Sequence, residues 1–146
     1  MVESTKRPST QGPLLPIPDP VVIRNDSPCK ALKLLDDKFI LLGFDSGDIK
    51  VYDRKTLDLL STQQVLKFPV LKLSRAMIAI LAQHKDPQGT LLVMKPPDSR
   101  QGFTMEVVYK LETLVQSFTL FTSTVMQLPG SATDQILIAM PAGDKP

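Results

Sequence analysis

The chain has 146 residues, a formal net charge of +2 from 17 basic and 15 acidic residues, no Trp and only 2 Tyr. The interspersed charges form no basic stripe for binding nucleic acid by counterion release, and the few aromatic residues disfavour base-stacking platforms. The single cysteine, Cys29, excludes an internal disulfide, and it cannot build a zinc site without further cysteine or histidine ligands.

No part of the sequence predicts a membrane or secretory segment. The longest apolar runs, such as Ala76–Ala82, are too short to cross a bilayer. The N-terminus also lacks the apolar core of a secretory signal. We therefore expect a soluble protein of the cytoplasm or nucleus, neither secreted nor anchored by a transmembrane segment.

Residues 1–20 form a proline-rich lead-in with Pro8, Pro13, Pro16, Pro18 and Pro20. Proline removes backbone donors and disfavours helix at the preceding residue, so this segment is expected to be disordered. A Pro-rich segment can also bind aromatic-lined grooves. Here, however, no Pro-x-x-Pro has a well-placed basic flank, which favours a simple tail.

From residue 21 onward, short apolar runs alternate with turn formers, which predicts consecutive antiparallel strands. The first unit has expected strands at 29–35, 38–44, 49–53 and 57–63. Asp36 and Asp37 belong to the first turn. Asp45–Asp48 forms a second, tight turn, in which Gly47 can adopt a positive φ without a steric penalty.

The second unit is expected to have strands at 69–74, 77–82, 105–110 and 114–120, with 18 extra residues within 83–104, between its second and third strands. The segment Thr90–Met94 is apolar enough to be the second or third strand instead, and the sequence leaves both arrangements open. A third unit begins near 122–128 and continues with a strand at 134–140.

These units repeat in sequence. Ala31–Leu42 matches Val70–Leu81 at an offset of 39 residues, and Val51–Leu57 matches Val108–Leu114 at an offset of 57. Ile40–Asp48 matches 136–144 at an offset of 96. The second offset exceeds the first by 18 residues, which is the length of one insertion. The third offset exceeds the second by 39 residues, which is the length of one further unit. A unit of about 40 residues made of short strands is the period of a β-propeller blade.

The segment Asp45-Ser-Gly-Asp-Ile-Lys-Val-Tyr-Asp53 resembles the end of a WD repeat, with Tyr52 in the Trp position. The resemblance covers roughly residues 27–144. It implies that the aromatic ring packs between neighbouring blades and that Asp53 satisfies turn amides. Val108-Tyr109-Lys110 is a weaker second copy without the Asp, and the Gly-His pair of WD repeats is missing.

The order of motifs is also similar to that of the PROPPIN family of phosphoinositide-binding autophagy propellers, through Leu111-Glu-Thr-Leu114. That family reads lipid headgroups through a paired-arginine motif. This chain has no Arg-Arg pair, so lipid binding is not transferred to any named residue.

We therefore predict an all-β fold, a partial WD-like β-propeller of about two and a half antiparallel blades spanning 21–146. The blades are expected at 27–63, at 69–120 with the insertion 83–104, and, as a half blade, at 122–146. A closed propeller needs at least four blades. The chain is therefore expected to be a truncated product, to be completed by another chain, or to be a β-sandwich of about ten strands instead.

Residues suited to catalysis are scarce. His84 is the only histidine and is placed in the insertion loop, where solvation is expected. Asp45 and Asp48 lack the bidentate Glu of a calcium loop. We expect no catalytic residue, metal or cofactor. The candidate partner-binding residues lie in the insertion: His84, Lys85, Asp86, Lys95, Asp98 and Arg100.

The predicted function is a non-catalytic scaffold for protein–protein interaction, with protein partners and no nucleic acid. Two alternatives remain. The first is a PROPPIN-like phosphoinositide-binding protein of membrane trafficking or autophagy. The second is a small β-rich enzyme, which the near absence of histidine disfavours.

Overall fold

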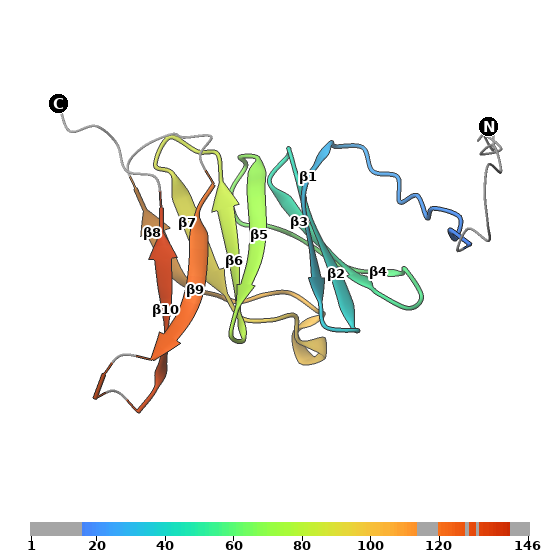
Figure 1. Ribbon diagram of the computed structural model, residues 1–146. Coiled ribbons are helices and arrows are strands. Elements are labelled where there is room, and N and C mark those ends of the chain that lie inside the picture. The colour runs from blue at the N-terminus through green and yellow to red at the C-terminus, as the bar shows by residue number, and fades with distance from the viewer. Residues whose placement is uncertain (1–15, 114–119, 128, 131, 141–146) are drawn as a thin grey trace, which may run out of the picture.

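The computed structural model describes residues 16–113, 120–127, 129–130 and 132–140. Within them the regular structure is antiparallel β-sheet with one short 3-10 helix, η1 (Ser99–Gln101), which confirms the predicted all-β class. Three sheets stand side by side (Figure 1). Sheet one consists of β1 (Cys29–Leu35), β2 (Phe39–Phe44), β3 (Asp48–Asp53) and β4 (Leu59–Gln64). Sheet two consists of β5 (Val70–Ala76), β6 (Ala79–His84), β7 (Thr90–Met94) and β8 (Val107–Glu112). Sheet three consists of β9 (Thr122–Gln127) and β10 (Asp134–Ala139).

Sheet one has the simple order β1-β2-β3-β4, and its strands begin and end within two residues of the predicted bounds. Turn chemistry explains this agreement. Gly47 has a φ of 92°, as predicted for the second turn. In the third turn the Asp53 carboxylate accepts hydrogen bonds from the backbone N–H of Lys55 at 2.8 Å and of Thr56 at 2.9 Å. These bonds lower the pKa of Asp53 and confirm its predicted role in satisfying turn amides.

Sheet two has the order β5-β6-β7-β8; its first two strands lie within two residues of the predicted bounds, but the third and fourth strands were predicted wrongly. Thr90–Met94 is the third strand and pairs with both β6 and β8. The segment predicted as the third strand, 105–110, overlaps the fourth strand. The match between 51–57 and 108–114 therefore aligned a third strand with a fourth. Of the strand predicted at 114–120, residues 114–119 lie outside the described residues, and Leu120 is not in a strand.

The insertion consequently lies between the third and fourth strands, at 95–106, and not within 83–104 as one loop. The cause is a compact turn after β6. Buried Asp86 accepts hydrogen bonds from both the backbone N–H, at 2.7 Å, and the hydroxyl of Thr90. The Gly89 N–H also donates to the Asp86 carbonyl at 2.9 Å, with Gly89 at a φ of 60°. This turn brings Thr90 directly into the next strand.

Sheet three contains β9 and β10, paired from Thr122 with Ala139 to Gln127 with Asp134. The expected strand at 134–140 is therefore present with nearly the predicted bounds. The rest of the third unit, 141–146, lies outside the described residues, as do residues 1–15 of the proline-rich lead-in.

Two apolar layers separate the three sheets, instead of the single layer of a two-sheet sandwich. The first layer contains Leu41, Ile49 and Val51 of sheet one with Leu73, Ile80, Leu92 and Met94 of sheet two. The second contains Ala76, Leu81 and Leu91 of sheet two with Phe121, and Ile136 and Ile138 of β10 pack against it. Because side chains alternate along a strand, β6 supplies both layers, and sheet two is buried on both faces.

The offset between structurally equivalent residues of sheets one and two is one or two residues longer than the offset of 39 found in the sequence. Aligning the β1–β2 and β5–β6 hairpins at the pairs that close their turns makes Leu32 equivalent to Leu73 and Leu41 equivalent to Leu81. The Leu-Lys-Leu match at an offset of 39 instead aligned Leu32 with Leu71. The first strands of successive sheets are also neighbours, since β5 contacts both β1 and β9.

Candidate functional site

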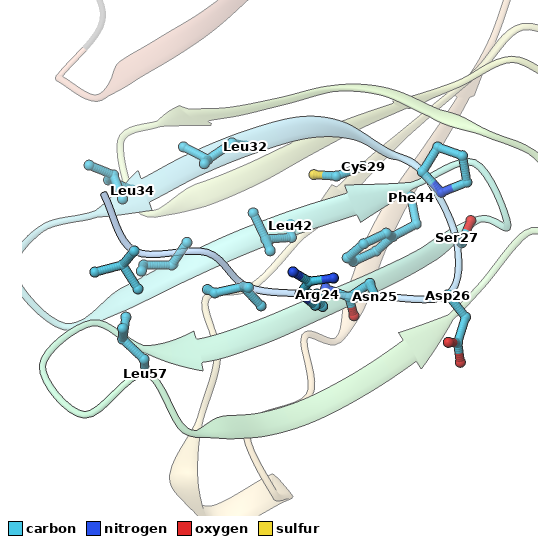
Figure 2. A pocket seen from close by; sticks show the side chains of 14 residues that line it. Arg24, Asn25, Asp26, Ser27, Cys29, Leu32, Leu34, Leu42, Phe44 and Leu57 are labelled. Carbon is cyan, nitrogen blue, oxygen red and sulfur yellow. The ribbon is translucent and has the colours of Figure 1, made fainter. Parts of the chain in front are cut away.

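The outer face of sheet one, on the side away from sheet two, is apolar. It carries Leu32 and Leu34 from β1, which lie opposite Leu42 and Ile40 from β2. Phe44 and Tyr52 complete this surface, which we call the end face. A hollow of about 870 Å³ lies over it, and Figure 2 shows the leucines of both strands lining that hollow. Among the described residues, no other sheet covers the end face.

The segment 21–28, which precedes β1, runs across part of the end face (Figure 2). Ile23 packs against Leu42, Phe44 and Tyr52, which are buried as a result. The side-chain oxygen of Asn25 accepts hydrogen bonds from the Lys50 ammonium at 2.7 Å and from the Tyr52 hydroxyl at 3.3 Å. The segment therefore covers the β2–β3 half of the face and leaves the leucines of β1 exposed.

Tyr52 thus differs from what its WD-like position implies. The ring lies on the end face beneath the N-terminal segment, and not between sheets one and two. Tyr109, in the weaker second copy of the motif, lies on β8 with its side chain largely exposed. Neither aromatic ring fills a layer between two sheets of the described chain.

The insertion loop 95–106 is fixed against sheet one. The Gln63 side-chain amide donates to the Met105 carbonyl at 2.7 Å, and its oxygen accepts from the Met105 N–H at 2.9 Å. The Ser61 hydroxyl donates to the Phe103 carbonyl at 2.8 Å. The Phe103 ring meets Phe39 edge-on, with centroids 5.9 Å apart. A loop that belongs to sheet two is thereby anchored on sheet one.

The loop also borders a hollow of about 650 Å³, lined by Lys38, Phe39, Ile78, Lys95, Pro96 and Asp98 among others. Lys95 is exposed and pairs with Glu106 at 2.9 Å. Asp98 caps η1 by accepting from the Arg100 N–H at 2.9 Å. Arg100 is exposed. Of the six predicted partner-binding residues, Lys95, Asp98 and Arg100 therefore lie together on this loop.

The other three lie elsewhere. His84 ends β6 and Asp86 is in the turn that follows, and both side chains are buried. Lys85, between them, is half-buried, and its N–H donates to the Pro69 carbonyl at 2.8 Å. The prediction of a solvated loop histidine was wrong because β6 extends through residue 84.

Burial lowers the pKa of His84 to about 4 because the charged ring would lose its water. The nearby Asp86 carboxylate and the Ala82 carbonyl oppose this shift only in part. Neither ring nitrogen has a partner with hydrogen-bond geometry. A neutral ring closed off from solvent is poorly placed to exchange protons with a substrate.

The anchoring of the loop can be tested by replacing Gln63 with Leu. The change removes two hydrogen bonds and leaves the Met105 N–H buried without a partner, so we expect unfolding to require about 1–3 kcal/mol less. Amide exchange of residues 95–106 should accelerate. The matched control is Gln64→Leu, which removes one exposed bond, to Ser46, and should change little. Equal losses in the two variants would contradict the proposed anchoring.

Sequence reasoning missed the end face. One signal was available: β2 is apolar at five of six positions, as is typical of a strand covered on both faces. Among the described residues, no group of three His, Cys, Asp or Glu side chains could hold a metal ion. The described part of the chain also contains no helix with the length and apolarity needed to cross a membrane.

Comparison with known proteins gives no family. No protein-family model and no curated protein matches the chain. Among solved structures, the chain is similar to the crystal structure of the computationally designed Ika4 protein, with a TM-score of 0.43 and 13% sequence identity. The match covers 84% of this chain and 96% of the other.

Proposed function

We propose that this chain is a non-catalytic scaffold for protein–protein interaction, built from WD-like blades as an open arc of a β-propeller. Two features of the fold support the proposal. Sheets one and two are four-stranded meanders of the same strand order, and the first strands of successive sheets are neighbours. Radial repetition of such sheets is the arrangement of a propeller.

The anchoring of the loop 95–106 on sheet one is the observation that carries the interaction role. A loop held at Phe103 and Met105 loses little conformational entropy when a partner binds, which favours affinity. Its side chains offer both signs of charge: Lys95 and Arg100 are exposed cations, and Asp98 is a half-buried anion. Pro96 and Phe103 supply apolar contact within the same hollow. We propose that protein partners bind here.

Two other functions have less support. Histidine is the side chain used most often for general acid–base catalysis, and the only histidine of the chain is buried. A phosphoinositide reader would need clustered cations, and the sequence has no Arg-Arg pair. Salt-sensitive binding of the purified protein to liposomes that carry such headgroups would favour the lipid-binding alternative over the scaffold.

Charge reversal on the loop tests the scaffold proposal. In cells that express the tagged chain, proteins cross-linked to it would be compared between wild type and the double variant Lys95→Glu/Arg100→Glu. We expect a specific set of partners to fall about tenfold or more in the variant, since charge complementarity is lost. The control Lys30→Glu/Lys67→Glu makes the same change of net charge at exposed sites outside the loop and should retain them. An identical partner set for all three proteins would contradict the proposal.

A further inference from the structure

The two ends of the stack of sheets expose leucines whose equivalents inside the stack are buried. Leu32 on the end face is 60% exposed, whereas its equivalent in sheet two, Leu73, is 5% exposed. At the other end, Leu137 of β10 is 55% exposed. Its equivalents, Leu41 and Leu81, are both 0% exposed.

Two observations make Leu137 equivalent to Leu41: the sequence match and the direction in which the side chain points. The match at an offset of 96 residues aligns it with Leu41. Its neighbours Ile136 and Ile138 pack against the layer between sheets two and three. Because side chains alternate along a strand, Leu137 points away from that layer. Leu41 and Leu81 point in the same direction along the stack, each toward the following sheet.

The two exposed ends are therefore complementary halves of a contact that already exists within the chain. Sheet one presents Leu41 to sheet two, and sheet two presents Leu73 to sheet one. On the outward face of β10, Leu137 repeats the position of Leu41, and on the end face Leu32 repeats the position of Leu73. We propose that a second copy of this chain binds end to end, with β9 and β10 of one copy packed on the end face of the next. The inference names one partner of the scaffold proposed above and rests on the same repeated stack.

The N-terminal segment is compatible with this contact. Inside the chain, sheets one and two meet through β1 and β5, with β2 also touching β5. The segment that carries Ile23 covers the half of the end face near β3, through Asn25 and Tyr52. The exposed leucines of β1, Leu32 and Leu34, lie on the half that a neighbouring sheet would reach first.

The proposed contact is heterologous, because different surfaces of the two copies meet. This property gives a specific test by sedimentation velocity over a range of protein concentrations. The wild type should form species larger than the monomer. Leu32→Asp and Leu137→Asp should each weaken association about tenfold or more, because an aspartate would be buried in an apolar contact. Val65→Asp, at a 40% exposed position in the connection between β4 and β5, is the control and should associate like the wild type.

Mixing the two variants makes the test sharper. The Leu32→Asp protein keeps an intact β10 end, and the Leu137→Asp protein keeps an intact end face. Their equimolar mixture should therefore restore one contact and form a heterodimer, although neither variant associates alone. Circular dichroism of each variant checks that it remains folded.

A monomeric wild type at high micromolar concentration would overturn the inference. Undiminished association of Leu137→Asp alone would also overturn it, because two end faces would then be meeting each other. Neither result bears on the scaffold proposal, whose test changes Lys95 and Arg100, which lie on the insertion loop away from both exposed ends.

Discussion

Replacing Gly47 with Ala is expected to destabilise the protein by more than about 3 kcal/mol. The left-handed φ of 92° alone costs a non-glycine residue about 1–2 kcal/mol. A Cβ at this position would also lie 2.0 Å from the Leu66 carbonyl oxygen and 2.9 Å from that of Phe68, both of them backbone atoms. The β2–β3 turn and the connection from β4 to β5 would have to separate. Chemical denaturation measures the loss.

Gly102 is the matched control for this prediction. It also has a left-handed φ, of 63°, but an added Cβ would meet nothing within 4 Å. Gly102→Ala should therefore cost only the conformational term of about 1–2 kcal/mol. The difference between the two variants isolates the close approach of the chain around Gly47. Similar losses in both would show that the connection does not cross this turn.

Acidification from pH 6.5 to pH 4 is expected to remove about 3 kcal/mol of stability through His84 alone. Below pH 6.5 the histidine of the unfolded chain takes up a proton, while the folded chain keeps the ring neutral down to about pH 4. Within this window the unfolded state binds more protons, so the free energy of unfolding falls as the pH falls. Above pH 6.5 the titration of His84 does not lower the free energy of unfolding. Below about pH 4 the whole loss of stability due to His84 has occurred.

The variant His84→Phe separates this effect from that of the carboxylates. Phenylalanine already occupies the equivalent end of β2, at buried Phe44. Denaturation curves at several pH values should show a shallower loss of stability for the variant between pH 6.5 and pH 4. The variant should also be at least as stable as the wild type at pH 7, since two unpartnered ring nitrogens are removed. Parallel curves for the two proteins would contradict the burial of a neutral ring.

The parts of the fold that were predictable are those in which local chemistry decides the structure. In sheet one, the Asp45–Asp48 turn and the Asp53 turn fix where strands begin and end, and both can be read from residue types. In sheet two the deciding group is Asp86, whose bonds to Thr90 form only in a buried turn. Nothing in the sequence distinguishes this aspartate from a surface one.

The site was predictable in part for a similar reason. Lys95, Asp98 and Arg100 are on one loop because they are close in sequence. The anchoring of that loop is a contact across 42 residues, between Gln63 and Met105, and it leaves no periodic signal. The end face was missed because its exposure depends on how the sheets stack, and strand patterns show only that both faces of β2 are apolar.

Successive sheets stack face to face, so that the equivalent leucines Leu41 and Leu81 lie in separate apolar layers. Methyl–methyl nuclear Overhauser effects test this most directly. Leu41 should show contacts with methyl groups of its own layer, from Leu73, Ile80 or Leu92, and Leu81 with those of Ile136 or Ile138. Contacts that join Leu41 and Leu81 in one common layer would contradict the stack and restore a two-sheet sandwich.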